Sequence, residues 1–185
     1  MRWDHLFDDI EGQLERELGA QEQDLVAEEE RLRLGRLAVR DRLRALHDSS
    51  TEPLSITLTT GIRLLLAVEG FGRDWVSADV IDGTVGRGHC LLPISAIASI
   101  RLAPGRVAAS LDCERDARAE ASLALRLGLP FVLRDLCRRR RPVELVTASA
   151  TARGTIDRVG RDHLDLAVHE PGSPRRAGQI SEVAV

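Results

Sequence analysis

The chain has 185 residues, of which 43% are hydrophobic and 30% are charged, enough for a packed core in one or two domains. Its 26 basic residues are all arginine and nearly balance 29 acidic ones, so the net charge of −3 argues against a generally basic, nucleic-acid-binding surface. Three cysteines at wide spacings fit neither a disulfide framework nor a Cys-x-x-Cys metal site, and no apolar run is long enough to cross a bilayer. We therefore expect a cytoplasmic protein with reduced thiols and no membrane association.

Residues 4–47 are predicted to form a helix with segregated charge. Apolar side chains begin at a three- to four-residue spacing and then thin to one in every seven, too narrow a stripe for a strong coiled coil. Gly19 and Gly35 are the expected weak points or bends. Carboxylates crowd positions 4–30 and arginines crowd positions 31–44.

Two interpretations of this helix stay open. It is either a solvated, salt-bridged helix or an arm that docks on a partner or dimerises, because an isolated helix with a narrow apolar stripe needs something to pack on. The second interpretation assigns partner binding to Trp3, Leu6, Phe7 and Ile10.

The rest of the chain contains an internal repeat. Residues 72–80 and 160–168 lie 88 positions apart and share the turn sequence Gly-Arg-Asp, and residues 94–98 are echoed by 180–184. Alternating apolar residues flank both turns, which is the period of a half-buried strand. The pattern predicts one small β module used twice.

The predicted fold is α+β. An N-terminal helical arm (1–50) precedes a first β-barrel module (51–105), a helical linker (106–141) and a second β-barrel module (142–185). The first module should contain strands at 54–59, 62–68, 75–80, 89–93 and 99–102, with glycine available for positive φ in the tight turn over 70–74. The linker should be helical over 117–127 and 129–141.

Five short strands with a Gly-Arg-Asp turn between the second and third resemble an Sm-like or SH3-like barrel. Residues 94–100 resemble the apolar motif that closes Sm-like barrels, and the resemblance covers 54–102 and 142–185. The RNA-contacting residues of that family are not recognisable here, so the resemblance implies a fold and no ligand site. As a whole, the chain is similar to a family of actinobacterial proteins with an acidic helix and tandem modules, which implies no activity.

The second module has little sequence left for a fifth strand. One hypothesis is that a strand from another segment or subunit completes it, because open sheet edges invite pairing. The alternative is that residues 182–185 suffice as a short strand.

The only dense basic cluster is Arg138, Arg139, Arg140 and Arg141. These side chains either hold nucleic-acid or nucleotide phosphates or stabilise a helix C-terminus that ends at Pro142. Trp75 is expected on an outward strand position, where it either anchors a partner or is covered by the arm or the linker.

Other polar groups have structural explanations. His163 and Asp165 share an outward strand face that fits half of a metal or acid–base site, but the first module has Trp75 and Ser77 there. Asp74 and Asp162 recur in both turns and are expected to accept backbone N–H bonds. Cys90 is expected to pack as a small hydrophobe.

No nucleophile, acid–base set, phosphate-binding loop or metal-ligand spacing recurs, so we expect no catalytic residues, no metal and no cofactor. The sequence predicts a non-enzymatic intracellular interaction or regulatory protein that binds a protein partner through its helical arm and barrel surfaces. The alternative is an RNA- or DNA-binding regulator that uses the four arginines and barrel loops. Homo-oligomerisation would proceed through the arm or the C-terminal strand edge.

Overall fold

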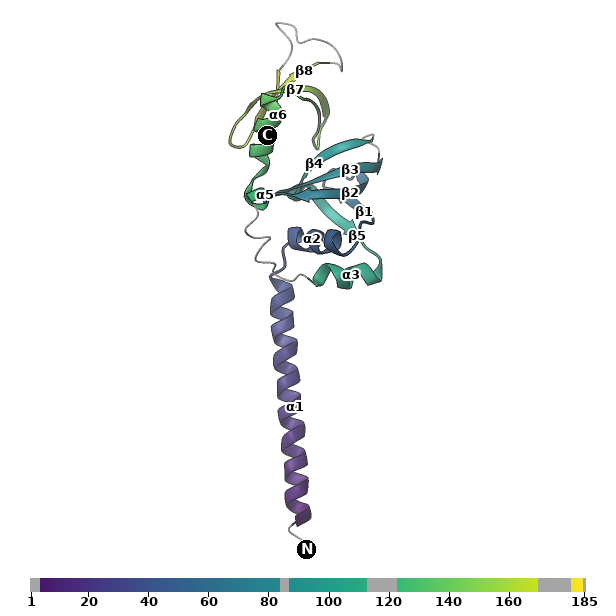
Figure 1. The fold of residues 1–185 in the computed structure, drawn as a ribbon, viewed down its shortest axis with the longest axis vertical. Coiled ribbons are helices and arrows are strands. Elements are labelled where there is room, and N and C mark those ends of the chain that lie inside the picture. The colour runs from purple at the N-terminus through teal and green to yellow at the C-terminus, as the bar shows by residue number, and fades with distance from the viewer. Residues whose placement is uncertain (1–3, 84–86, 113–122, 170–180, 185) are drawn as a thin grey trace.

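The structure is a computed structural model that describes residues 4–83, 87–112, 123–169 and 181–184. It is an α+β fold with two separate antiparallel sheets, of five and four strands (Figure 1). None of the helices in these described ranges is both long and apolar enough to span a bilayer.

The N-terminal segment forms two helices where one was predicted. α1 (Asp4–Gly35) passes through Gly19 without a break, and the chain leaves the helix at Gly35, the second expected weak point, before α2 (Val39–Ser49) begins. The break has a packing cause: Leu43 and Leu46 of α2 are 0% and 1% exposed in the core of the first sheet. α1 instead extends away from both sheets as a straight rod (Figure 1).

The first sheet contains the five strands expected from the alternating pattern. They are ordered β4-β3-β2-β1-β5, and the 3₁₀ helix η1 (Ile94–Ala96) joins β4 to β5. Inward positions such as Leu54, Ile56 and Val76 are buried and form a core with α2. The strands are β1 (Leu54–Leu58), β2 (Arg63–Phe71), β3 (Trp75–Gly83), β4 (Gly88–Pro93) and β5 (Ile97–Arg101).

In the described residues, three short helices follow the first sheet. α3 (Pro104–Leu111) packs on α2, where Arg42 donates a 2.8 Å hydrogen bond to the fully buried Ser110 hydroxyl. α5 (Leu123–Arg126) lies in the first predicted linker helix, and much of that helix, with Cys113 before it, falls outside the described residues. α6 (Leu129–Arg138) ends three residues earlier than predicted, and Arg140 after it has a positive φ of 51°.

The second sheet follows α6, which packs on its core through Leu133 and Leu136. Leu164 and Leu166 are buried as predicted from their alternation, and the strand order is β6-β7-β8-β9. The strands are β6 (Pro142–Val146), β7 (Thr151–Val159), β8 (Leu164–Val168) and β9 (Ser181–Ala184).

The repeat predicted from residues 72–80 and 160–168 is present in the backbone. In each module the turn is closed by the same 2.8 Å hydrogen bond, from the amide of Gly72 to the carbonyl of Trp75 and from Gly160 to His163. Both hairpins also carry a β-bulge at the matching place, between Val68 and Gly70 in β2 and between residues 156 and 158 in β7. The two hairpins are therefore copies of one unit.

The second echo is not a structural equivalence. Residues 94–98 form η1 and the start of β5, whereas residues 181–184 form β9. β9 pairs with β8 as β4 pairs with β3, so its counterpart is β4. A short C-terminal strand does form, but it takes the place of the fourth strand and not of the fifth strand that residues 182–185 were expected to supply. Within the described ranges, no strand covers the outer edge of β6, where β5 pairs with β1 in the first sheet.

Candidate functional site

The outer part of α1 carries exposed leucines at seven-residue intervals. Leu18, Leu25 and Leu32 have 51%, 66% and 50% of their surface exposed, and every residue from 21 to 33 is exposed. Seven residues make nearly two helical turns, so the three side chains form one stripe along the rod. Of the residues assigned to partner binding, Leu6, Phe7 and Ile10 lie on α1, and Trp3 lies outside the described residues.

The charges on α1 are partly paired within the helix. Arg31 contacts Glu28 at 2.6 Å and Arg33 contacts Glu30 at 2.7 Å. The hydrogen bond from Arg33 also holds the pKa of Glu30 below its ordinary value. Arg33 donates a further 3.0 Å bond to the carbonyl of Leu111, which ties the base of the rod to the end of α3.

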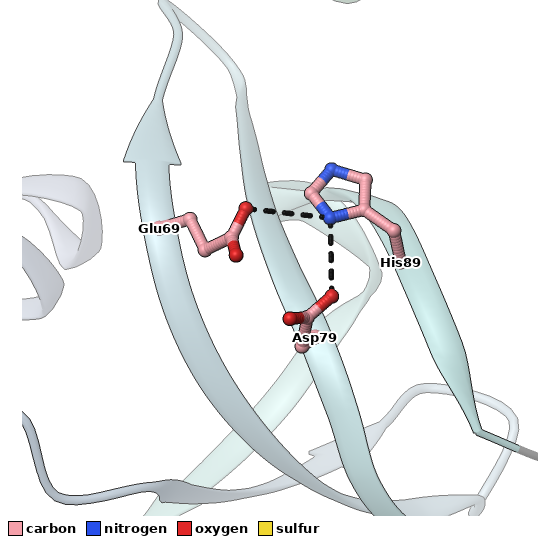
Figure 2. Close-up of side chains that lie close together, drawn as sticks. All are labelled: Glu69, Asp79 and His89. Carbon is pink, nitrogen blue, oxygen red and sulfur yellow. Dashed lines mark hydrogen bonds and ion pairs between the residues drawn. The ribbon is translucent and has the colours of Figure 1, made fainter.

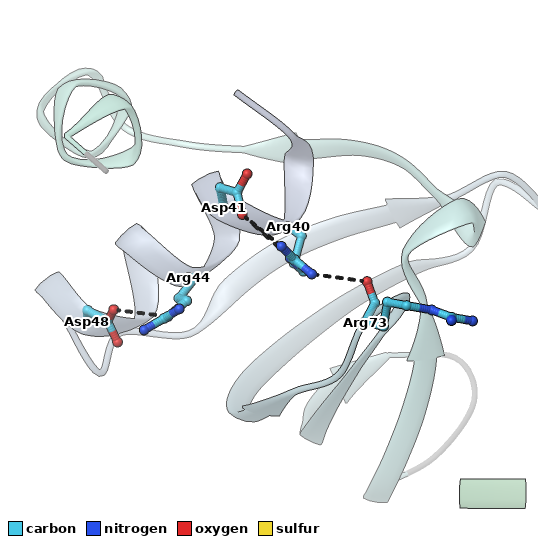
Figure 3. A network of polar contacts seen from close by, with 5 residues as sticks. All are labelled: Arg40, Asp41, Arg44, Asp48 and Arg73. Atoms are coloured by element: carbon cyan, nitrogen blue, oxygen red, sulfur yellow. Dashed lines mark hydrogen bonds and ion pairs between the residues drawn. The ribbon is translucent and has the colours of Figure 1, made fainter. Parts of the chain in front are cut away.

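The Gly-Arg-Asp turn of the first module is a junction of several segments. The Trp75 indole N–H and the Arg73 amide both donate to the carbonyl of Leu127, at 3.1 and 2.9 Å. On the other side, Arg40 of α2 reaches the Arg73 carbonyl at 3.5 Å (Figure 3). Trp75 is therefore covered by the linker, which is one of the two alternatives expected for it.

Both recurring aspartates accept a backbone N–H bond, as expected, although the donor to Asp74 lies outside its own turn. Asp74 accepts a 2.7 Å bond from the amide of Leu129 and so caps the start of α6. Asp162 accepts a 2.9 Å bond from its neighbour His163, which holds the pKa of Asp162 below its ordinary value. The sequence repeat thus preserves the turn while its side chains take different partners.

The glycines of the first turn do not use the positive φ that is available to them; Gly61 and Gly88 do so in this module. Gly72 is required for another reason. A Cβ atom there would lie 2.1 Å from the Trp75 indole, which packs directly over the glycine.

The arginine cluster lies at the C-terminal end of α6 and beyond it. Arg139 contacts Asp135 at 2.7 Å, Arg138 lies 3.8 Å from the same carboxylate, and Arg140 contacts Asp157 at 3.0 Å. Three of the four arginines thus pair with two carboxylates, which offsets part of the charge that phosphate binding would use.

A cluster of metal-ligand side chains lies on the outer face of the first sheet. Glu69, Asp79 and His89 come from three neighbouring strands, and one ligand atom from each lies within 4.8 Å of the others. His89 Nδ1 is 3.3 Å from the Asp79 carboxylate and 3.4 Å from that of Glu69 (Figure 2). All three side chains are exposed.

The sequence did not predict this cluster, because each of the three residues lies ten positions from the next and this spacing matches no metal-ligand motif. The signal was the strand register: once the hairpins are paired, Asp79 lies directly opposite His89. The pair that the sequence singled out behaves differently, since His163 hydrogen-bonds to Asp162, its neighbour in the turn.

Comparisons of the chain with family models, with curated proteins and with solved structures found no match.

Proposed function

We propose that this protein is a non-enzymatic intracellular interaction protein that binds a protein partner through α1. The observation that carries the proposal is the leucine stripe on a 32-residue helix that extends away from both sheets (Figure 1). The two sheets, with α2, form the body from which this helix projects.

The stripe provides the driving force for docking. Burying one leucine side chain contributes roughly 1.5–3 kcal/mol, so Leu18, Leu25 and Leu32 together can supply the apolar centre of a helix-in-groove contact. Isolated helices gain little stability from propensity alone and depend on packing of an apolar face. A partner that covers the stripe would therefore also stabilise α1.

The negative charge of α1 determines which kind of partner can dock on its leucine stripe. Residues 18–30 contain five carboxylates and no arginine, so the stripe is flanked by negative charge. Two copies of α1 packed in parallel would bring these carboxylates together and repel. The partner that fits is a basic amphipathic helix, whose cations complement the arm and whose apolar face covers the leucines.

The body supports the Sm-like or SH3-like interpretation. The order β4-β3-β2-β1-β5, with a short 3₁₀ turn before the last strand, fits the barrel predicted from the sequence. We propose that the first sheet closes in this way and serves as a scaffold that presents the arm.

A crosslinking experiment on the full chain identifies the partner. A photoreactive residue at position 25 should capture a protein in cells, and the same probe at the exposed Gln23, on the far side of the helix, is the positional control. The captured protein is then purified and its affinity measured with the wild-type chain and with a variant carrying Leu18→Gln, Leu25→Gln and Leu32→Gln.

The stripe variant should bind the captured protein about tenfold more weakly for each leucine that the partner buries, and so about a thousandfold more weakly if all three are buried, because each such leucine contributes more than about 1.4 kcal/mol. A control with Gln23→Ala and Ala27→Gln should bind like the wild type. Equal affinity of the wild type and the stripe variant would contradict the proposal. Capture of a second copy of this chain would show that the arm dimerises instead.

A further inference from the structure

We propose that Glu69, Asp79 and His89 form a binding site for a divalent transition-metal ion, with Zn²⁺ as the ion that fits best. The site lies on the outer face of the first sheet, away from the arm, and is independent of the partner-binding role. Imidazole nitrogen and carboxylate oxygen are both regular zinc ligands.

The strand register brings the three side chains to one face. Asp79 on β3 lies opposite His89 on β4 and opposite Ala67 on β2. Glu69, two residues after Ala67, is the unpaired residue of the bulge between Val68 and Gly70. Alternation along β2 places Glu69 on the same face as Ala67, and the small alanine leaves its carboxylate room to reach across β3.

The separations suit a tetrahedral ion. Zinc bonds of about 2.0–2.1 Å to nitrogen and oxygen place neighbouring ligand atoms roughly 3.3–3.4 Å apart in a tetrahedron. His89 Nδ1 is 3.3 Å from Asp79 Oδ1 and 3.4 Å from Glu69 Oε2 (Figure 2). Two of the three separations thus already match a tetrahedral site, and the Glu69 and Asp79 ligand oxygens lie within 4.8 Å of each other.

The charge balance of the cluster also favours a cation. Several other carboxylates of the described surface pair with arginine, as in Arg140–Asp157 and Arg153–Glu144. Within the described ranges, the ion pairs of Glu69 and Asp79 are both with His89. Two carboxylates thus share one imidazole, and a divalent ion would neutralise both while binding the neutral ring.

The fold does not require these residues. In the second module, the bulge position that matches Glu69 holds Asp157, which pairs with Arg140. The position that matches Asp79 holds Ala167, and its neighbour across the strand is Ser181. The repeated hairpin forms without the triad, so its presence in the first module is not explained by the needs of the sheet.

Three protein ligands leave one tetrahedral position for water or for a donor from another molecule. The side chains are exposed, so an ion could enter directly from solvent. The ligand set holds two anions and one neutral group, which gives the site no net charge when Zn²⁺ is bound.

Calorimetric titration of the full, untagged chain with Zn²⁺ at neutral pH tests the proposal. We expect a saturable site of one ion per chain. His89→Ala and Asp79→Asn should each weaken it by at least the roughly 10–100-fold that loss of an outer-shell contact costs a metal site. Circular dichroism of each variant checks that the sheet is intact.

His163→Ala is the matched control, because it removes the other exposed histidine–carboxylate pair. It should leave zinc affinity unchanged, and so should Cys90→Ala, which removes the neighbouring thiol. The proposal is overturned if the wild type binds no zinc, if His89→Ala binds as tightly as the wild type, or if His163→Ala or Cys90→Ala weakens binding as much as His89→Ala.

Discussion

At two glycines of the second module, an added Cβ atom would collide with a neighbouring atom. The neighbour is backbone in one case and side chain in the other. At Gly154 the nearest atom is the backbone carbonyl oxygen of Ala167, at 2.1 Å, which can move only if the β7–β8 pairing moves. At Gly160 it is the imidazole of His163, at 2.4 Å, which is exposed and can rotate into solvent.

Gly154→Ala should therefore lower the free energy of unfolding by about 1–3 kcal/mol or more, as overpacking does in a closed space. Gly160→Ala should cost less than about 1 kcal/mol, because alanine restricts the unfolded chain and offsets the displaced ring. Both substitutions lie in one module, so urea denaturation compares them directly. Equal losses would show that the carbonyl contact can relax.

The raised pKa of the Cys90 thiol predicts how the stability of the folded protein depends on pH. Burial raises its pKa above the ordinary value, with the charge of Asp79 acting in the same direction and a backbone hydrogen bond opposing both. The folded state therefore holds the thiol proton more tightly than the unfolded state. This contribution to stability is complete below the ordinary thiol pKa and is lost as the pH rises through the raised one.

Alkylation of Cys90 in the native protein should consequently begin at higher pH than alkylation of the same residue in the denatured chain. Mass spectrometry of the peptide that contains Cys90 separates its reaction from those of Cys113 and Cys137. A native midpoint equal to the denatured midpoint would show that the thiol is not shielded.

At the scale of elements, removal of α1 and removal of α2 should change the stability of the body by different amounts. Deleting residues 1–37 removes a helix whose residues 21–33 are all exposed and should leave the melting temperature of the body nearly unchanged. Deleting residues 1–49 also removes the buried Leu43 and Leu46. Loss of each costs roughly 2–5 kcal/mol, so the first sheet should unfold or aggregate. A stable, cooperative melt of the longer deletion would contradict the role given to α2.

A second prediction at the scale of elements concerns the hydrogen bond by which Asp74 caps α6. Asp74→Ala removes the acceptor for the Leu129 amide and should cost about 1 kcal/mol, whereas Asp74→Asn keeps a capping oxygen and should cost less. Hydrogen exchange of the Leu129 amide should accelerate in the alanine variant alone. Faster exchange in both variants would mean that the carboxylate charge, and not the cap, holds the linker.

The strands were predictable from sequence because each has one buried face, so alternation identifies it, as in Leu54, Ile56 and Leu58. The division of the N-terminal helix was only suggested by Gly35, since the apolar face of α2 looks like a continuation of the stripe on α1. The second echo was misread for a similar reason. Short alternating segments look alike in sequence, whether they take the place of β4 beside β3 or of β5 beside β1.

Among the candidate sites, the exposed stripe of α1 was visible as a seven-residue period, which depends on local sequence alone. The triad of Glu69, Asp79 and His89 was not, because it depends on the register of three strands and on a bulge. The cover over Trp75 depends on Leu127, 52 residues away. Features created by tertiary contact between distant segments leave no local pattern in the chain.

At the scale of the whole molecule, we propose that a folded body presents an acidic helix and that a partner covers Leu18, Leu25 and Leu32. This arrangement predicts a large difference in local stability between the rod and the body. Within the described part of the chain, the contacts of the rod with the body are at its base, where Arg33 meets Leu111. The remainder should open easily when the protein is free.

Hydrogen exchange of the full chain, free and bound to the protein captured from position 25, measures this difference most directly. We predict that amides of residues 18–32 exchange rapidly in the free monomer, while those of α2 are protected, and that binding slows exchange across the stripe. Slow exchange of residues 18–32 in the free monomer, or no change on binding, would contradict the assignment of α1 as the docking element.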